Sequence, residues 1–297
     1  MRVQPGDVLG EGGLDALDGG DVGQLQYKHD QQATRPGRPG PAPGVRRARP
    51  SINVSRTMTT AHLDHGGREN LPGDWPTTEA EAIAVQDELR GRVVTDEAGP
   101  PPGEPLVVVG VDVAYDDERD VVAAAAVALD AQTFDVVEEA TAVGRVAFPY
   151  VPGLLAFREI PTVLAALGAL TVTPGLIVCD GYGLAHPRRF GLAAHLGVLT
   201  GLPTIGVAKN PFTFTYAPPG PRRGDTSPLL DGDEEVGRAL RTQDGVKPVF
   251  VSVGHRVSLD HACAHALRLA RDFRLPETTR AADSLCRRAL SNAAAGA

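Results

Sequence analysis

Three acidic residues lie at positions where a carboxylate is costly to bury unless a cation or a hydrogen bond offsets its charge. Asp112 interrupts the apolar run LVVVGVDVAY, Asp180 follows GLIVC and opens a glycine-rich turn, and Glu159 lies in the mostly apolar segment GLLAFREI. Each acid alone has an ordinary explanation, as a hydrogen-bonded strand residue, a turn residue or an ion-paired helix residue. If the fold brings them together, they repel one another without a cation, and their oxygen ligands suit Mg²⁺ or Mn²⁺. Such a site can support phosphodiester hydrolysis.

Imidazole and basic side chains follow these acids along the chain. His186, in DGYGLAHPRRFG, could orient water, move a proton or bind a metal, or could simply precede a helix that begins at Pro187. Arg188 and Arg189 add positive charge at the same place. Lys209 ends the run PTIGVAK, where it could hold a phosphate or the attacking water, or be an ordinary surface lysine.

Two further residues could complete the acidic cluster. His255 and Asp260 lie in SVGHRVSLDHA, on either side of the expected start of a helix. Ser258 between them is a candidate N-cap for that helix.

The spacing of apolar residues predicts a mixed α/β sheet with flanking helices. Helices are expected from Thr77, over about 153–170, about 187–200 and 258–273. Strands are expected over 106–115, 121–130 and around 134–148 as an antiparallel meander, over 175–181 and 203–209 as a parallel pair, and over 236–254 as a hairpin turning at Asp244-Gly245. Residues 216–235 are rich in Pro, Gly and Asp and are predicted to be a loop. This order of elements is that of the ribonuclease H-like fold.

Residues 1–75 differ in composition from the rest of the chain. They are rich in Gly, Pro, Asp, Arg and Gln and show neither helical nor strand periodicity. This predicts either a disordered extension or a reading frame that runs ahead of a true start at Met58. We expect one catalytic domain over 76–290 and a flexible tail over 291–297.

The composition narrows the class of protein. The chain has 297 residues, of which 42% are hydrophobic and 22% charged, as in an ordinary globular protein. It has no apolar run of the roughly 20 residues that a membrane span needs and no apolar signal-peptide core. Its three cysteines are far apart, which argues against a zinc site or a disulfide framework and favours the cytoplasm. A net charge of -8 argues only mildly against a nucleic-acid partner, because phosphate binding needs just a local basic patch.

Several blocks in the same order resemble the endonuclease V family, the deoxyinosine-directed nucleases of DNA repair. They are VVGVDVAYDD, FPYVPGLLAFRE, CDGYGLAHPRRFGLAAHLGVLTGLPTIGVAK and KPVFVSVGHRVSLD, and the resemblance extends from about Asp74 to Cys286. By this resemblance Asp112, Glu159 and Asp180 are the metal-binding catalytic acids. His186, Lys209 and His255 match further active-site positions, and the fourth ligand is either His255 or Asp260.

The resemblance also assigns a role to the segment ahead of Glu159. In the family this loop is a wedge that separates the strands at the lesion; here its residues are Pro149, Tyr150, Val151, Pro152 and Gly153. The two prolines fix φ and stiffen the loop, so Tyr150 can stack where a base is displaced. Displacing a base costs less where it is mismatched or damaged.

Hypoxanthine resembles guanine without the 2-amino group, so a pocket can recognise it through backbone groups and exclude guanine by a clash. Gly181 and Gly183 could bring the backbone close to such a base, and Arg188 is a further substrate-binding candidate. Two features depart from the family pattern. Tyr182 stands where relatives often carry a small amide residue, and Asn210-Pro211 is an unusual sequel to Lys209.

The resemblance implies a magnesium-dependent endonuclease, with manganese able to substitute, that acts as a monomer on DNA containing deoxyinosine. It implies cleavage of the second phosphodiester bond 3′ to the lesion, which leaves 3′-hydroxyl and 5′-phosphate ends. Two alternatives stay open: an endoribonuclease for inosine in single-stranded RNA, which a 2′-hydroxyl contact would favour, and an ATPase of the actin or sugar-kinase type. A second glycine-rich phosphate motif, which such an ATPase would carry, is not found in the sequence.

Overall fold

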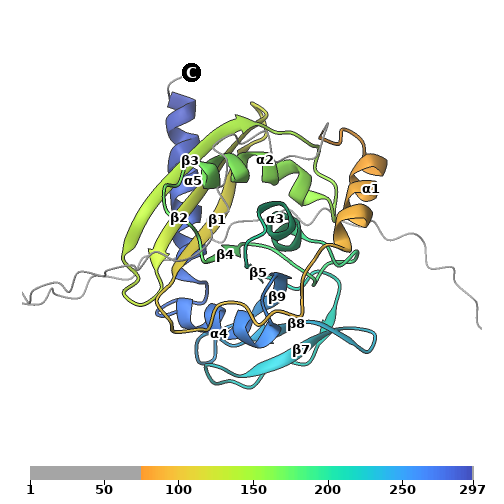
Figure 1. Ribbon diagram of the computed structural model, residues 1–297, viewed down its shortest axis with the longest axis vertical. Coiled ribbons are helices and arrows are strands. Elements are labelled where there is room, and N and C mark those ends of the chain that lie inside the picture. Colours follow the sequence, from red (N-terminus) through yellow and green to blue (C-terminus); the bar gives the residue numbers. More distant parts are fainter. Residues whose placement is uncertain (1–74, 296–297) are drawn as a thin grey trace, which may run out of the picture. The chain divides into compact units, whose positions relative to one another are not determined.

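One continuous sheet organises residues 75–295, the part of the chain that the computed structural model describes (Figure 1). Its nine strands are β1 (Val107–Asp116), β2 (Val121–Asp130), β3 (Val136–Arg145), β4 (Leu176–Cys179), β5 (Thr204–Ala208), β6 (Thr215–Tyr216), β7 (Thr226–Asp231), β8 (Glu234–Leu240) and β9 (Val249–His255). They lie in the order β3-β2-β1-β4-β5-β9-β8-β7-β6. The predicted extension over 1–75 and the candidate start at Met58 fall, apart from Trp75, outside the described residues.

The first five strands confirm the predicted fold. β1, β2 and β3 form an antiparallel meander, and β4 and β5 then add to β1 in parallel. This is the ribonuclease H-like arrangement of a mixed sheet. β9 returns antiparallel to β5, and its pairing with β8 confirms the hairpin expected around Asp244-Gly245.

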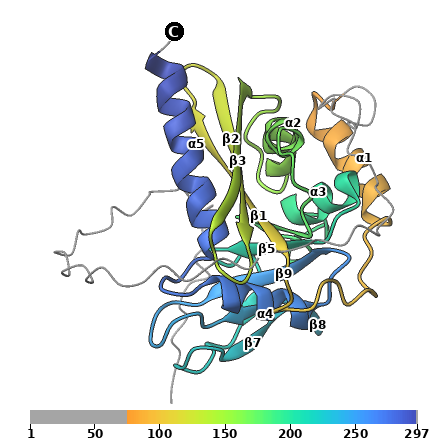
Figure 2. The ribbon, with the colours of Figure 1, turned by 60° about the vertical axis from the view of Figure 1, so that its left-hand side comes forward.

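Five helices accompany the sheet in the described residues: α1 (Glu79–Arg90), α2 (Leu155–Gly168), α3 (Leu192–Thr200), α4 (Leu259–Leu269) and α5 (Glu277–Ala295). α1 begins as predicted, since Thr78 and Glu81 form a capping box. Residues of α2 and α3 pack on Val109 and Val111 of β1, whereas α5 packs on the other face of β1 and β2. Figure 2 shows α2 and α5 on opposite sides of these strands.

The alanine-rich strand β2 allows both layers to approach the sheet. Ala124, Ala126 and Ala128 belong to the core cluster that includes α2, and their neighbours Ala125 and Val127 belong to the cluster that includes α5. Successive side chains of a strand point to opposite faces, so this alternation is expected. Small side chains on both faces bring the helices close to the sheet.

Two predictions about elements were wrong, and one helix was missed. Residues 216–235, expected to be a loop, contain β7 and the start of β8, because a strand near the edge of a sheet tolerates Pro228 and turn residues at its ends. The helix expected from 187 begins only at Leu192, after the N-cap Gly191. The helix α5 was not predicted, and it includes residues 291–295 of the expected flexible tail, where the alanines of SNAAA favour helix.

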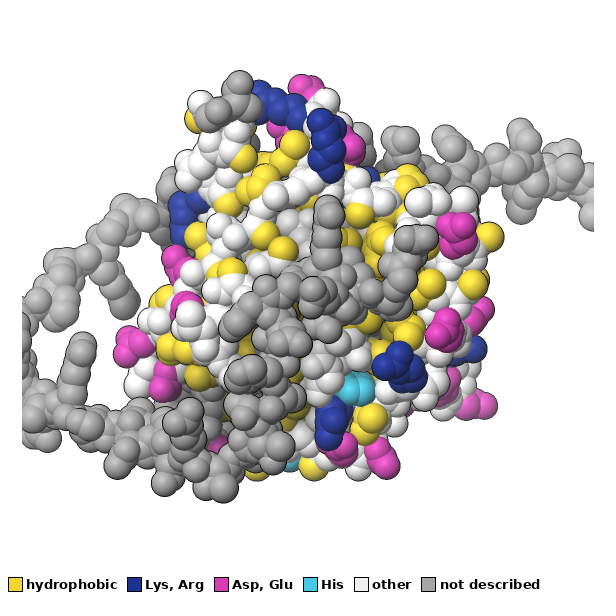
Figure 3. Space-filling view, turned by 45° about the horizontal axis from the view of Figure 1, so that its top comes forward, with side chains coloured by type: hydrophobic (Ala, Val, Ile, Leu, Met, Phe, Trp, Pro, Cys, Tyr) yellow, Lys and Arg dark blue, Asp and Glu magenta, His cyan; other side chains and the backbone are white. Residues whose placement is uncertain are grey.

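The described surface carries charges of both signs. Figure 3 shows acidic and basic side chains scattered among apolar ones on the face that it presents. Within residues 75–295, no helix is both long enough and apolar enough to cross a membrane.

Candidate active site

Asp112 and Asp180 stand side by side on one face of the sheet. The parallel ladder between β1 and β4 ends one residue before them, so each is the next residue along its strand. Val108 and Val178, which precede them at even spacing, share one core cluster, and alternate residues of a strand face the same way. The middle of β1 and the carboxyl end of β4 therefore present two adjacent carboxylates on the face that α5 covers.

The environment of Asp112 disfavours its charged form. Burial is the main reason that its pKa lies well above the usual value for an aspartate, and the negative charge of Asp180 adds to the effect. The positive charge of Lys209 and the hydrogen bond that the Val113 N–H donates to Asp112 Oδ1, at 2.8 Å, act in the opposite direction. A cation beside Asp112 would stabilise its charged form.

Lys209 supplies a positive charge beside these acids. It directly follows β5, and its Nζ lies 2.5 Å from Asp180 Oδ2. Burial disfavours the ammonium form, but the surrounding carboxylates outweigh burial, so the pKa of Lys209 is raised. These carboxylates are Asp180, Asp112 and Asp283.

Asp283 of α5 is a site residue that the sequence analysis missed. Its negative charge is among the smaller causes of the raised pKa values of both Asp112 and Lys209. Its side chain also pairs with Arg287, at 2.9 Å. The available signal was an acid beside the buried positions Ala282 and Cys286 of an amphipathic helix.

Glu159 approaches from the opposite face of the sheet. It lies on α2, is only 6% exposed, and accepts a hydrogen bond of 3.0 Å from the hydroxyl of Tyr115 on β1. Burial raises the pKa of Glu159 to about 8, and the charge of Asp180 adds to that rise. The Tyr115 hydroxyl and the Arg158 guanidinium partly offset both effects.

The charges of the three predicted acids all act on one buried thiol. Burial, followed by the charges of Glu159, Asp180 and Asp112, raises the pKa of the Cys179 thiol. The fold thus brings together the acids that the sequence analysis singled out. Their spacing is nevertheless wider than that of a formed metal site: in residues 75–295 no group of three or more His, Cys, Asp or Glu side chains is close enough to hold an ion.

His255 and Asp260 do not join these carboxylates. β9 runs antiparallel to β5, so His255 pairs with Thr204 at the start of β5, about 13 Å from the end that carries Lys209. The ring Nδ1 of His255 accepts a hydrogen bond of 3.1 Å from the Val94 N–H. Asp260 is exposed and pairs with Arg238 at 2.5 Å.

The loop over residues 149–153 is exposed between two buried anchors. Phe148 and Leu154 are buried in one core cluster, whereas the side chain of Tyr150 is 58% exposed. Gly153 has a φ of +82°, a conformation that residues with a side chain rarely adopt. Tyr150 is therefore presented to solvent from a short, anchored loop.

His186 holds this loop rather than the carboxylates. Its Nδ1 accepts a hydrogen bond from the Arg188 N–H at 3.2 Å, which leaves Nε2 protonated to donate to the Gly153 carbonyl at 3.0 Å. Burial, together with the nearby charge of Arg188, lowers the pKa of His186 to about 4. The ring is accordingly neutral near pH 7, with both nitrogens engaged.

The predicted glycines lie in the loop 180–191, which connects β4 to α3. A Cβ at Gly183 would come within 1.9 Å of the Val253 carbonyl oxygen, so this glycine permits the loop to pack on β9. A Cβ at Gly181 would meet only Leu192, at 3.6 Å, and Gly181 has a φ of +157°. Gly181 directly follows Asp180 and Gly183 comes two residues later, so the backbone of this loop begins beside that acid.

A model of the family described as Endonuclease V matches residues 87–284, more than half of the chain. The chain belongs to the endonuclease V family. The matched range includes Asp112, Glu159, Asp180, Lys209 and Asp283.

Individual relatives agree with this result. An endonuclease V from Streptomyces avermitilis is 77% identical over 225 residues, which cover 76% of this chain and 98% of that protein. The crystal structure of endonuclease V from the same organism has a TM-score of 0.73 and covers 75% of this chain and 98% of the other. A structure of Ciona intestinalis endonuclease V, in complex with a 24mer DNA containing an inosine followed by a ribo-adenosine, is 28% identical with a TM-score of 0.62, covering 72% and 98% of the two chains.

The two departures that we noted from the endonuclease V pattern contact each other. The Tyr182 hydroxyl donates to the Asn210 carbonyl at 2.7 Å, and its ring packs edge-on against Phe212. This contact joins the loop after β4 to the segment after β5, beside Asp180 and Lys209.

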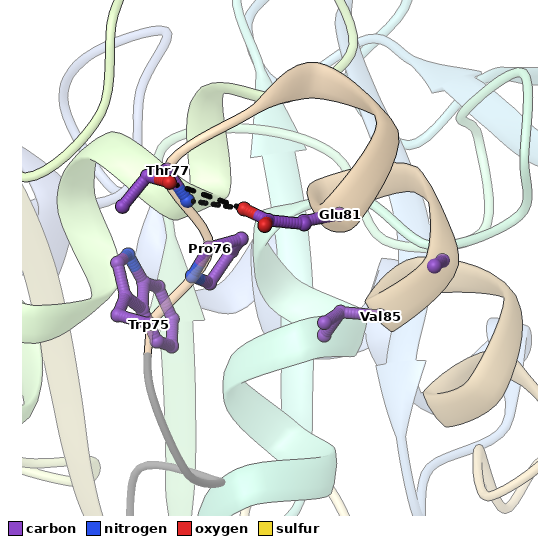
Figure 4. Close-up of a pocket in the computed structure, with 6 residues that line it drawn as sticks. Trp75, Pro76, Thr77, Glu81 and Val85 are labelled. Carbon is purple, nitrogen blue, oxygen red and sulfur yellow. Dashed lines mark hydrogen bonds between the residues drawn. The ribbon is translucent and has the colours of Figure 1, made fainter.

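A pocket lies apart from these residues, at the start of α1 (Figure 4). It is lined by Trp75, Pro76, Thr77, Glu81, Ala84 and Val85, and both the N–H and the hydroxyl of Thr77 donate to Glu81. None of the predicted site residues lines it, so the acids and not this pocket mark the candidate active site.

Proposed function

We propose that this protein is a metal-dependent endonuclease that recognises hypoxanthine in DNA and hydrolyses the second phosphodiester bond on its 3′ side. The observation that carries the proposal is the convergence of Asp112, Asp180 and Glu159 from two strands and a helix, with Lys209 beside them. The inosine-containing DNA bound by the Ciona relative supports the choice of substrate.

The donor set fits a divalent metal ion of the Mg²⁺ or Mn²⁺ type. It offers carboxylate oxygens, and burial, with the charge of Asp180, raises the pKa values of Asp112 and Glu159, which a bound cation would counteract. Asp112, Asp180 and Glu159 would hold the ion, and Asp283 is the further acid within reach. When bound, the ion polarises a water molecule and neutralises charge that develops on the phosphate.

The protein's own residues orient the reacting groups. The Lys209 ammonium lies at the end of β5 and can donate to a phosphate oxygen or to the attacking water. The Tyr115 hydroxyl holds Glu159 in one orientation through its hydrogen bond to Oε1. The proton of the attacking water passes to solvent or to a nearby carboxylate that does not hold the ion.

Lesion recognition is assigned to the two loops beside the acids. Tyr150 is exposed on the stiff loop over 149–153 and can fill the space of a displaced base. The backbone around Gly181 and Gly183 would contact the base itself, while Glu159 follows the loop by six residues and couples recognition to cutting. We further propose that the protein acts as a monomer in the cytoplasm.

The test is cleavage of a labelled duplex that carries a single deoxyinosine, with Mg²⁺ or with EDTA. We expect a metal-dependent nick at the second bond 3′ to the lesion and none in the same duplex with adenosine. The absence of a nick in the presence of Mg²⁺ would overturn the proposal. Asp112→Asn serves as the inactive control for contaminating nucleases.

Cleavage of RNA is a second candidate function. The DNA bound by the Ciona relative carries a ribo-adenosine after the inosine, so that protein accommodates a 2′-hydroxyl next to the lesion. A single-stranded RNA with one inosine, cut faster than the matched DNA, would move the assignment from DNA repair to RNA processing.

A further inference from the structure

Gln86 is a buried amide whose N–H groups and oxygen are all engaged. The residue is 1% exposed and lies on α1. Its Nε2 donates to the Gly153 carbonyl at 3.0 Å and to the Phe190 carbonyl at 3.2 Å. Its Oε1 accepts from Arg188 Nε at 2.5 Å. A buried amide bound on every side permits only one arrangement of its neighbours.

Ordinary helix packing does not call for a polar residue at this position. The buried residues of α1 are Ala82, Gln86 and Leu89, which form the stripe that faces the rest of the protein. An apolar side chain in the middle of this stripe would be the usual choice. Burial of an amide costs free energy unless its hydrogen bonds are made, so the hydrogen-bond partners of Gln86 are the reason for its presence on α1.

The hydrogen-bond partners of Gln86 belong to the two loops that recognise the lesion in the proposed function. Gly153 closes the 149–153 loop, and Arg188 and Phe190 belong to the 180–191 loop. The Gly153 carbonyl also accepts from His186 Nε2 at 3.0 Å and lies 3.5 Å from Arg188 Nη2. This one carbonyl is therefore the point where α1 and both loops meet.

We propose that Gln86 is a positioning residue that fixes the 149–153 loop against the 180–191 loop, and thereby sets the distance between Tyr150 and the turn at Gly181. The inference rests on the proposed function, because that function supplies the reason for the two loops to keep a fixed separation. Gln86 itself lies one residue before the range that the family model matches. The matched range thus begins within α1, one residue after the side chain that joins the two loops.

Gln86 should influence binding of the lesion more than cutting. Asp112 and Asp180 are held by β1 and β4, and none of the hydrogen bonds of Gln86 reaches them. A misplaced 149–153 loop lowers the affinity for the base. At a saturating substrate concentration the DNA still binds, and its phosphate still reaches the carboxylates. The signature is a raised KM with a kcat close to that of the wild type.

The deciding experiment compares Gln86→Met with the wild type and with Gln132→Met as matched control. Gln132 is an exposed glutamine whose amide bonds Gly103, far along the chain from both loops. For Gln86→Met we expect a KM for a deoxyinosine duplex raised about tenfold, a kcat within about twofold, and unchanged Mn²⁺ affinity by calorimetry. Hydrogen exchange should speed up in both loops together. Gln132→Met should match the wild type in all four measurements.

Hydrogen exchange separates this inference from the proposed function, because it needs no substrate. If the wild type fails to cut but exchange still rises in both loops of Gln86→Met, the positioning role stands and the function fails. Unchanged exchange and unchanged KM would overturn the positioning role. If Gln86→Met does not fold, Gln86→Glu decides, since it keeps the shape and the acceptor for Arg188 and loses only the donors to Gly153 and Phe190. Failure of both variants to fold would make Gln86 a residue of the core alone and overturn the proposal.

Discussion

Gly110 of β1 lies directly beneath Thr278 of α5: a Cβ on this glycine would come within 2.3 Å of the Thr278 carbonyl carbon and oxygen. The two elements run in the same direction, since Ala114 further along β1 packs in one cluster with Cys286 further along α5. From Gly110 to Asp112 is about 7 Å along the strand, and from Thr278 to Asp283 about 7.5 Å along the helix. The close approach at Gly110 therefore sets Asp283 at about the same level along the sheet as Asp112, whose pKa its charge helps to raise.

Replacement of Gly110 by alanine should push α5 away from the sheet. We expect a loss of about 1–3 kcal/mol in the free energy of unfolding, because backbone and not a flexible side chain stands in the way of the new methyl group. Cleavage should fall as well, since Asp283 moves away from Asp112. Urea denaturation and a cleavage assay check this, with Gly168→Ala as control, because nothing lies within 4 Å of a Cβ at that helical glycine. Equal stability of the two variants would contradict the packing argument.

Substitution of Asp283 and substitution of Asp260 should have different effects on cleavage, which tests which of the two is the fourth acid of the site. Asp283→Asn should lower metal-dependent cleavage by about 100-fold or more and weaken Mn²⁺ binding, because it removes a charge next to Asp112 and Lys209. Asp260→Asn should change neither, because that side chain is exposed and pairs with Arg238. Calorimetric titration with Mn²⁺ and single-turnover cleavage measure both effects. A larger loss in the Asp260 variant than in the Asp283 variant would restore the interpretation drawn from the sequence.

Replacement of Tyr150 by alanine should weaken lesion binding without loss of stability. The side chain is 58% exposed, so its removal costs the folded protein little, but it removes the ring that can stack where a base is displaced. We expect about 1–3 kcal/mol weaker binding to a deoxyinosine duplex in Ca²⁺, with unchanged affinity for an undamaged duplex and for Mn²⁺. Fluorescence anisotropy measures the two affinities. An equal loss for both duplexes would make Tyr150 a general contact and not a wedge.

His195 should make the protein less stable in acid. It is fully buried among Trp75, Phe157 and Phe190, neither ring nitrogen has a hydrogen-bond partner, and burial lowers its pKa to about 3. The unfolded chain takes up this proton near pH 6.5 whereas the folded protein does not. Stability from this residue is therefore complete above about pH 6.5 and is lost as the pH falls toward 3, by up to about 1.4 kcal/mol per unit.

The His195→Phe variant isolates this contribution. Its unfolding free energy should fall less between pH 7.5 and pH 5 than that of the wild type, measured by urea denaturation at each pH. The difference at pH 7.5 reports the change in packing alone, because His195 is neutral in both states there. Parallel pH profiles for the two proteins would refute the assignment.

The proximity of the acids on the sheet could be predicted from the sequence because the apolar pattern of each strand shows where its acid lies along that strand. Asp112 and Asp180 end or interrupt apolar runs of strand length, and parallel strands meet at one edge, so their proximity follows from local pattern. Glu159 follows from the helix that begins after Pro152. These inferences depend only on the residue pattern within a few positions of each acid.

The errors arose where proximity depends on distant contacts. His255 was grouped with the acids because it matches a position of the family and lies near the expected start of the last helix, whereas its strand is antiparallel to β5 and sets it at the end of β5 opposite to Lys209. Asp283 was missed because its position depends on the contact between Gly110 and Thr278, which no local pattern reveals. The buried role of Gln86 was likewise invisible, since glutamine is a common residue on the exposed face of a helix.

The order of the acids along the chain also determines when the site can exist during protein synthesis. Asp112, Glu159 and Asp180 leave the ribosome well before Asp283, which must then dock with α5 against β1 and β2. A nascent chain that already displays the 149–153 loop and two folded strands still lacks one of its carboxylates. Asp283 thus joins the other three acids only after the 149–153 and 180–191 loops have been synthesised.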